Sequence, residues 1–160
     1  MIRAAIVGLG WWGRTLVEAV QGQGKEIRFA AGATRTVTPE VQAFSRAQGF
    51  DLRAGYDELL KDSNIDAVVL ATPHSMHVPQ IVAAARAGKH VFCEKPFALT
   101  KAEALEAVQA MRKAGTTLAL GYNRRFHPTM ADLRERVRTG RLGSMLHFEG
   151  TLTFPNALPQ

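Results

Sequence analysis

The fold is decided at the start of the chain, by the stretch Ile2-Arg3-Ala4-Ala5-Ile6-Val7-Gly8-Leu9-Gly10-Trp11-Trp12-Gly13. Residues 2–7 are almost all aliphatic, which predicts a β-strand that is buried on both faces. Residues 8–13 then follow the pattern G-x-G-x-x-G. Such a string recurs by chance, but here it follows a buried strand and opens a helix. That context makes it a candidate dinucleotide-binding turn.

Each glycine of this turn has its own physical task. The first permits a tight turn, the second lets the backbone approach a pyrophosphate, and the third lets the helix pack closely on the strand. The amides at the start of the helix attract phosphate. The predicted turn consists of Gly8, Leu9, Gly10, Trp11, Trp12 and Gly13, with the tryptophans packing or forming a lid over the phosphates. The alternative is a glycine-rich turn that only packs a helix against a strand.

The rest of the chain alternates between short aliphatic runs and segments with helical periodicity. Strands are expected at 2–7, 27–33, 66–71, 89–93 and 117–121. The helices between them carry recognisable ends, such as Thr38-Pro39 before Gly49, and a capping box of Thr100 and Glu103 before Gly115. This rhythm predicts an α/β fold, a doubly wound parallel sheet of the Rossmann type, over residues 1–125.

The pattern changes over residues 126–160. A helix is expected at about 129–138, and residues 144–154 alternate apolar with polar side chains, which predicts a strand with one wet face. We interpret this region as the opening helix and first strand of a truncated α+β domain. The alternative is an added edge strand on the first sheet.

Composition narrows the classes of protein. The chain has 160 residues, a formal charge of +6 and one cysteine, Cys93, which excludes an intrachain disulfide and a multi-cysteine metal site. No apolar run reaches about 18 residues, so no membrane span is expected. Residues 2–7 leave no room for a signal peptide, which predicts a cytoplasmic protein. The basic residues are scattered, so nucleic acid is not the expected partner, and an anionic cofactor or an acidic substrate explains the charge equally well.

The end of the second strand bears on the choice of cofactor. NAD-binding folds usually place an acid there, on the ribose 2′-hydroxyl. This sequence has Thr34 and Arg35 instead, and no acid before Glu40. A hydroxyl and a guanidinium hold a 2′-phosphate that a carboxylate would repel. The prediction is therefore NADP(H), with NAD possible. The alternative is an exposed arginine that touches nothing.

Two further segments follow strands at the edge where doubly wound folds bind ligands. The candidates for a cofactor-binding role are Ala71, Thr72, Pro73, His74, His77, Glu94 and Lys95. A lysine at such a place polarises a substrate oxygen or exchanges a proton, although many such lysines are solvated surface residues. The spacing of His74 and His77 suits a metal, but no third ligand is evident, so no metal site is predicted.

Four motifs, taken together, resemble the glucose–fructose oxidoreductase and inositol dehydrogenase family (Gfo/Idh/MocA). They are GLGWWG at 8–13, ATPH at 71–74, AGKHVFCEKP at 87–96 and GYNRRFHP at 121–128. The resemblance implies that Lys95 lies beside the nicotinamide and the reacting carbon as the catalytic residue. It also implies a cis Lys95–Pro96 bond. Further implied contacts are those of Thr72, Pro73, His77 and Glu94 with the cofactor and of Asn123 and Arg124 with the substrate.

The resemblance also implies the activity. Its members move a hydride between nicotinamide and a carbinol carbon of a sugar, cyclitol or related polyol, and they assemble as homo-oligomers at full length. They continue well beyond a chain of this size, so we expect this piece to bind cofactor but to be catalytically incomplete. The alternative is a non-enzymatic NAD(P)-binding redox sensor.

Overall fold

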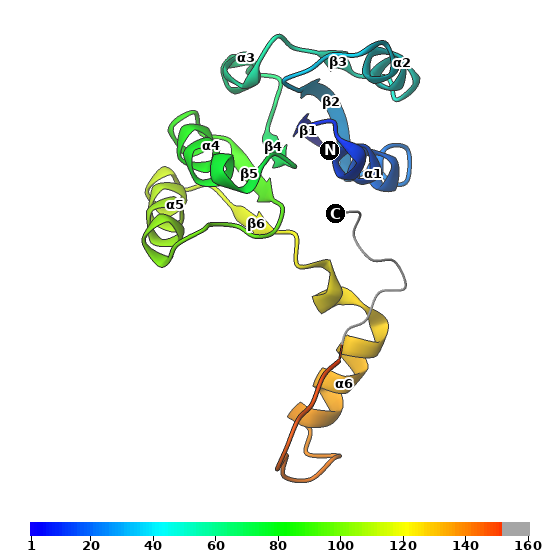
Figure 1. Cartoon of the computed structure of the whole chain (residues 1–160), viewed down its shortest axis with the longest axis vertical. Helices are drawn as coiled ribbons and strands as arrows, with labels where there is room; N and C mark the ends of the chain where they lie inside the picture. The colour runs from blue at the N-terminus through cyan, green and yellow to red at the C-terminus, as the bar shows by residue number, and fades with distance from the viewer. Residues whose placement is uncertain (152–160) are drawn as a thin grey trace, which may run out of the picture. The chain divides into compact units, whose positions relative to one another are not determined.

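A parallel sheet of six strands forms the first compact unit, Met1–Tyr122, of a computed structural model that describes residues 1–151 (Figure 1). The sheet has the order β3-β2-β1-β4-β5-β6, so the strand order reverses between β1 and β4. Such a reversal opens a crevice at the carboxyl ends of the strands, where this class of fold binds ligands. The doubly wound prediction is confirmed. The strands are β1 (Ile2–Val7), β2 (Ile27–Ala33), β3 (Asp51–Leu52), β4 (Ala67–Leu70), β5 (His90–Cys93) and β6 (Leu118–Leu120).

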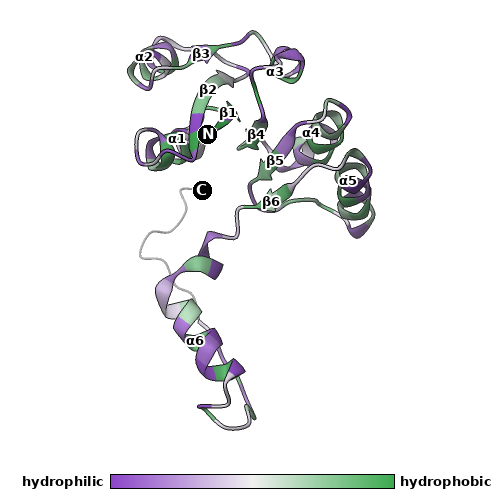
Figure 2. Cartoon of the chain, turned by 180° about the vertical axis from the view of Figure 1, so that it is seen from behind, coloured by the Kyte–Doolittle hydropathy of each residue, from purple (hydrophilic) through white to green (hydrophobic). Residues whose placement is uncertain are grey.

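Helices cover both faces of the sheet. They are α1 (Trp11–Val20), α2 (Pro39–Ala47), α3 (Tyr56–Lys61), α4 (His74–Arg86) and α5 (Lys101–Ala114). Side chains alternate along β1, so Ile6 joins one buried cluster with residues of α1 and α2, whereas Val7 joins another with residues of α3, α4 and α5. Figure 2 shows the resulting contrast between hydrophobic strands and helices of mixed polarity.

The helix ends agree with the capping signals in the sequence. The Thr38 hydroxyl accepts a hydrogen bond from the Val41 amide at 3.3 Å, and Pro39 is the first residue of α2. The capping box of α5 is complete, because Thr100 and Glu103 bond to each other's backbone amides. Local side-chain chemistry therefore fixes where these two helices begin.

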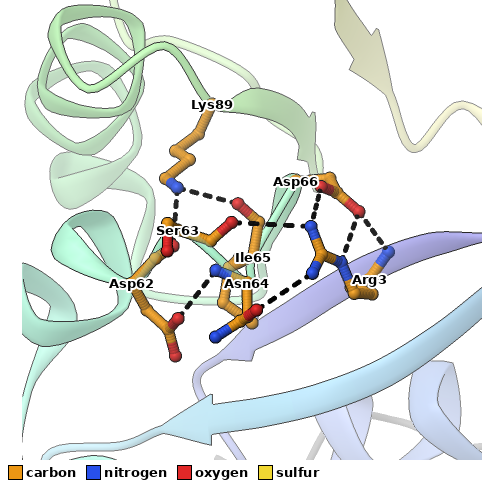
Figure 3. A network of polar contacts seen from close by, with 7 residues as sticks. All are labelled: Arg3, Asp62, Ser63, Asn64, Ile65, Asp66 and Lys89. Atoms are coloured by element: carbon orange, nitrogen blue, oxygen red, sulfur yellow. Dashed lines mark hydrogen bonds and ion pairs between the residues drawn. The ribbon is translucent and has the colours of Figure 1, made fainter.

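A polar network ties the amino ends of the central strands together (Figure 3). The Arg3 guanidinium donates to the Asp66 carboxylate at 2.7 Å, which holds the pKa of that carboxyl well below its usual range. The buried Lys89 ammonium donates to the carbonyl oxygens of Asp62 and Ile65, both at 2.7 Å. These contacts join the starts of β1, β4 and β5. The candidate site residues lie in loops at the opposite edge of the sheet.

The segment between β2 and β4 contains elements that the sequence pattern did not reveal. Strand β3 has only two residues, Asp51 and Leu52, which pair with Ala31 and Gly32 of β2. A strand this short shows no periodicity, so only its neighbour defines it. The short helix α3 follows, and its Leu59 is fully buried.

The second unit begins at Asn123 and is described to residue 151. It contains the 3-10 helix η1 (Asn123–Phe126) and the helix α6 (Pro128–Arg138), which matches the helix expected there. The strand expected at 144–154 is wrong for residues 144–151, which form no strand, either within the second unit or on the first sheet. A strand needs a neighbour to complete its hydrogen bonds, and the described part of this unit contains no other strand. Residues 152–154 lie outside the described part of the chain.

Among residues 1–151, the helices are all too short or too polar to cross a lipid bilayer.

Candidate functional site

The glycines of the turn between β1 and α1 differ in how closely other atoms approach them. Gly8 has a φ of +95°, and a Cβ there would lie 2.5 Å from the Ala71 carbonyl oxygen. A Cβ on Gly13 would overlap the backbone oxygen of Gly8. These two glycines let the turn, the helix and the end of β4 pack together. Gly10 is different, because no described atom beyond its neighbours Leu9 and Trp11 lies within 4 Å of a Cβ placed on it. Of these three glycines, Gly10 is therefore the one with open space beside it.

The amino end of α1 suits an anion. Among the described residues, no side chain caps this helix, and its first turn has no acidic residue. The first intrahelical hydrogen bond runs from the Arg14 amide to the Gly10 carbonyl oxygen at 3.1 Å. The amides of Trp11, Trp12 and Gly13 precede it, so the helix geometry leaves them without intrahelical acceptors. Such amides and the positive end of the helix dipole attract a phosphate group.

The structure brings Lys95 to this turn of residues 8–13, which we call the phosphate turn. Its Nζ atom lies 5.9 Å from the ring centroid of Trp12, within the range of a cation–π contact. The Trp12 ring in turn contacts Trp11, with ring centroids 5.4 Å apart. Trp11 is 77% exposed, whereas Trp12 is half-buried. The turn and the lysine are far apart in sequence, and they meet at the carboxyl edge of the sheet.

The segment after β5 places a buried carboxylate next to Lys95. The Lys95–Pro96 bond is cis, as expected. Glu94 is only 6% exposed, and its carboxylate accepts a hydrogen bond from the Lys95 amide at 3.2 Å. A Cβ on Gly121 would lie 2.6 Å from Glu94 Oε1. Burial raises the pKa of the preceding Cys93 thiol to about 12, so Cys93 is a neutral core residue.

The segment after β4 divides into exposed and buried parts. Ala71 and Thr72 are half-buried at the edge of the sheet, whereas Pro73 and His74 are exposed. His77 is fully buried, so the structure places its ring beneath this edge. Its contact with a cofactor stays a prediction, as do those of the other residues of this segment.

The residues predicted to bind a 2′-phosphate directly follow β2. Thr34 is half-buried and Arg35 is exposed immediately beyond the strand. Within residues 1–151, no hydrogen bond or ion pair joins Arg35 to another residue. The guanidinium is therefore available to a ligand.

Asn123 and Arg124 lie in η1, the first element of the second unit, and both are exposed. Their contact with a substrate stays a prediction. Sequence reasoning missed two residues near the other candidates, Gly121 and Gln80. Gly121 directly follows β6 and is the first residue of the motif at 121–128, which was a usable signal. Gln80 looks like an ordinary helix residue in the sequence, so no sequence signal pointed to it.

The strand order, the glycine turn and the uncapped helix together define a dinucleotide-binding Rossmann domain. Residues 2–122 match the family described as "Oxidoreductase family, NAD-binding Rossmann fold". The chain belongs to this Gfo/Idh/MocA family of oxidoreductases, as its motifs predicted.

Relatives of known type support the assignment. The chain is 32% identical to the inositol 2-dehydrogenase of Rhizobium meliloti, over 99% of this chain and 47% of the relative. It resembles the crystal structure of aldose-aldose oxidoreductase from Caulobacter crescentus complexed with glycerol, with a TM-score of 0.78 and 33% identity over 89% of this chain and 44% of the other. It also resembles scyllo-inositol dehydrogenase from Lactobacillus casei with bound NAD(H) and scyllo-inositol, with a TM-score of 0.81 and 27% identity over 89% and 42%. The chain thus spans less than half the length of these relatives.

Proposed function

We propose that this chain binds a nicotinamide dinucleotide, preferably NADP(H), across the carboxyl edge of its sheet. The whole protein then transfers a hydride between the nicotinamide and a carbinol carbon of a sugar, cyclitol or related polyol. The observation that carries the proposal is the meeting of the phosphate turn with Lys95, whose Nζ lies 5.9 Å from the Trp12 ring. A turn that served packing alone would not need a lysine beside it.

The residues present fit such a coenzyme. The uncapped start of α1 receives the pyrophosphate, and the clearance at Gly10 lets it approach the backbone. Thr34 and Arg35 hold the 2′-phosphate through charge-assisted hydrogen bonds. NAD(H) is the alternative coenzyme, and the Lactobacillus casei relative was crystallised with it.

Nicotinamide, when bound, supplies the hydride chemistry of the reaction. The chain's own contribution centres on Lys95, whose exposed ammonium donates a hydrogen bond to the substrate oxygen and shares in its proton transfer. Asn123 and Arg124, which belong to the second unit, stay the candidates from the sequence for binding the polyol hydroxyl groups. The buried Glu94 carboxylate accepts the Lys95 amide and so fixes the backbone that carries this lysine.

The test is a calorimetric titration of the chain with NADPH and with NADH. We expect NADPH to bind more tightly. Arg35→Asp should weaken NADPH by at least about tenfold, since a charge-assisted hydrogen bond is worth about 1.5–3 kcal/mol, and it should leave NADH almost unchanged. Arg28→Asp is the matched control, because Arg28 is an exposed arginine at the opposite end of the same strand. An equal loss for both coenzymes would remove Arg35 from the 2′-phosphate site, and no heat with either would refute coenzyme binding.

We further propose that the 160-residue chain, assayed by itself, binds coenzyme with little or no turnover and that a full-length form is a homo-oligomer. The relatives devote more than half of their length to residues with no counterpart here. Steady-state reduction of NADP⁺ by this chain, with a panel of inositols and aldoses, would contradict the first part.

A further inference from the structure

The imidazole of His77 joins two segments that carry the candidate site. His77 lies in the first turn of α4 and is fully buried. Its Nδ1 atom is 2.8 Å from the Pro96 carbonyl oxygen, and its Nε2 atom is 2.9 Å from the Thr72 carbonyl oxygen. Thr72 belongs to the segment after β4, and Pro96 follows Lys95 in the segment after β5. One ring therefore spans the two segments.

The two segments differ in how firmly they are held. The Thr72 hydroxyl also donates to the Gln80 side chain at 2.6 Å, and Gln80 is itself buried one turn after His77 on the same helix. Thr72 thus has two tethers to α4. Among the described residues, the Pro96 carbonyl oxygen has only the His77 ring as a side-chain partner. The contact with Pro96 is the one that the Lys95 segment depends on.

A carbonyl oxygen accepts hydrogen bonds and cannot donate them, and a neutral imidazole carries a single N–H, so the tautomer decides which of the two carbonyl oxygens receives the ring proton. A hydrocarbon side chain of the same shape would fill the space but would leave a buried carbonyl without a partner, which is costly. The choice of histidine here is therefore explained by a ring that can donate its N–H to a carbonyl oxygen on either side, and not by volume alone.

We propose that His77 is a positioning residue, which locks the Lys95–Pro96 segment to the Thr72 segment and so aims Lys95 at the nicotinamide half of the coenzyme. This inference rests on the proposed function. It assigns His77 a role beneath the site, in place of the direct cofactor contact that the sequence predicted, because the ring is fully buried. Among the described residues, the His77 ring makes no hydrogen bond to the phosphate turn itself, so loss of the ring should affect the nicotinamide end more than the pyrophosphate end.

The experiment compares two ligands that differ at one end. Wild type and variants are titrated with NADPH or NADH, whichever binds the wild type more tightly, and with the matching ADP-ribose, which has the same phosphates and no nicotinamide. We expect His77→Phe to weaken the dinucleotide by about fivefold, the value of one buried hydrogen bond, and to change ADP-ribose by less than about twofold. Ile81→Val, a fully buried change on the same helix, controls for lost stability and should change the affinities for the dinucleotide and for ADP-ribose by the same factor.

Two conservative variants identify the contact that matters. An asparagine amide replaces Nδ1 and keeps the bond to Pro96, whereas a glutamine amide replaces Nε2 and keeps the bond to Thr72. Because Thr72 has a second tether, His77→Asn should recover more dinucleotide affinity than His77→Gln. These two variants carry the comparison if His77→Phe does not fold. An NMR signal from a slowly exchanging His77 ring N–H is expected in the wild type.

The outcomes separate the two proposals. A wild-type chain that binds neither NADPH nor NADH defeats the proposed function and the role of His77 with it. A wild-type chain that binds, with variants that lose both ligands equally or lose neither, overturns the positioning role alone. A ring N–H in fast exchange with solvent would also overturn it.

Discussion

Replacing Gly10 by alanine is expected to separate coenzyme binding from folding. Gly10 caps α1 with φ −67° and ψ −175°, an extended conformation that any residue adopts. Apart from its neighbours Leu9 and Trp11, no described atom lies within 4 Å of a Cβ at this position. The folded chain therefore accepts the methyl group without strain. The ligand does not, because the same space is where a pyrophosphate approaches the backbone amides.

The magnitudes follow from these two facts. An unstrained Gly→Ala change restricts the unfolded chain and stabilises the fold by about 0.4–1 kcal/mol, which raises Tm by a few degrees at most for a chain of this size. Loss of one charge-assisted hydrogen bond to phosphate costs about 1.5–3 kcal/mol, or about ten- to a hundredfold in Kd. Thermal unfolding and calorimetric titration with NADPH measure the two effects on the same sample.

Gly13→Ala is the matched control, because its Cβ would overlap the backbone oxygen of Gly8. Overpacking against backbone destabilises proteins by about 1–3 kcal/mol or more, so this variant should lose several degrees of Tm in the absence of ligand. Gly10→Ala with unchanged coenzyme affinity would refute the assignment of the open space to the pyrophosphate. A large fall in the Tm of Gly10→Ala would refute the conclusion that this position accepts a methyl group without strain.

Three further predictions concern other parts of the first unit. Gly121→Ala should destabilise the fold by about 1 kcal/mol, at the low end for overpacking, because its Cβ would lie 2.6 Å from Glu94 Oε1 and the end of that side chain must shift. Denaturation in a Glu94→Ala background should show this cost much reduced. Asp66 has a folded-state pKa below its unfolded value because Arg3 donates to it, so its contribution to stability is present above about pH 4 and is lost as the pH falls through the folded pKa. Asp66→Asn should therefore flatten the acid limb of a stability–pH curve, and an unchanged limb would contradict the contact. Thr100→Ala removes the cap of α5 and should lower the free energy of unfolding, measured in urea, by about 1 kcal/mol. An unchanged free energy of unfolding would show that the cap does not stabilise the helix.

Local sequence signals were enough wherever the structure depends on neighbours along the chain. The turn at Gly8 to Gly13 needs glycines at fixed spacing, and the starts of α2 and α5 need Thr38 and Thr100 at their caps. The apolar runs of the central strands reflect burial on both faces of the sheet. These features yielded the fold class, the family and the edge at which the candidate site lies.

The alternating pattern at residues 144–154 shows the limit of such signals. Alternation describes a chain that would suit a half-buried strand, but a strand exists only where a neighbour completes its hydrogen bonds. The two-residue strand β3 is the opposite case, since it has no pattern and owes its existence to β2. Pairing is a property of two segments, so neither outcome was readable from one.

The sequence by itself determined the phosphate turn, the helix caps and the class of sheet, because each depends on residues that are close along the chain. Only the tertiary structure decided that Lys95 lies over Trp12, that Gly121 leaves room for the Glu94 carboxylate and that His77 is buried between two carbonyl oxygens. These contacts join separate strands at one edge of the sheet. Their geometry depends on the parallel register of β1, β4, β5 and β6, which sequence spacing does not specify.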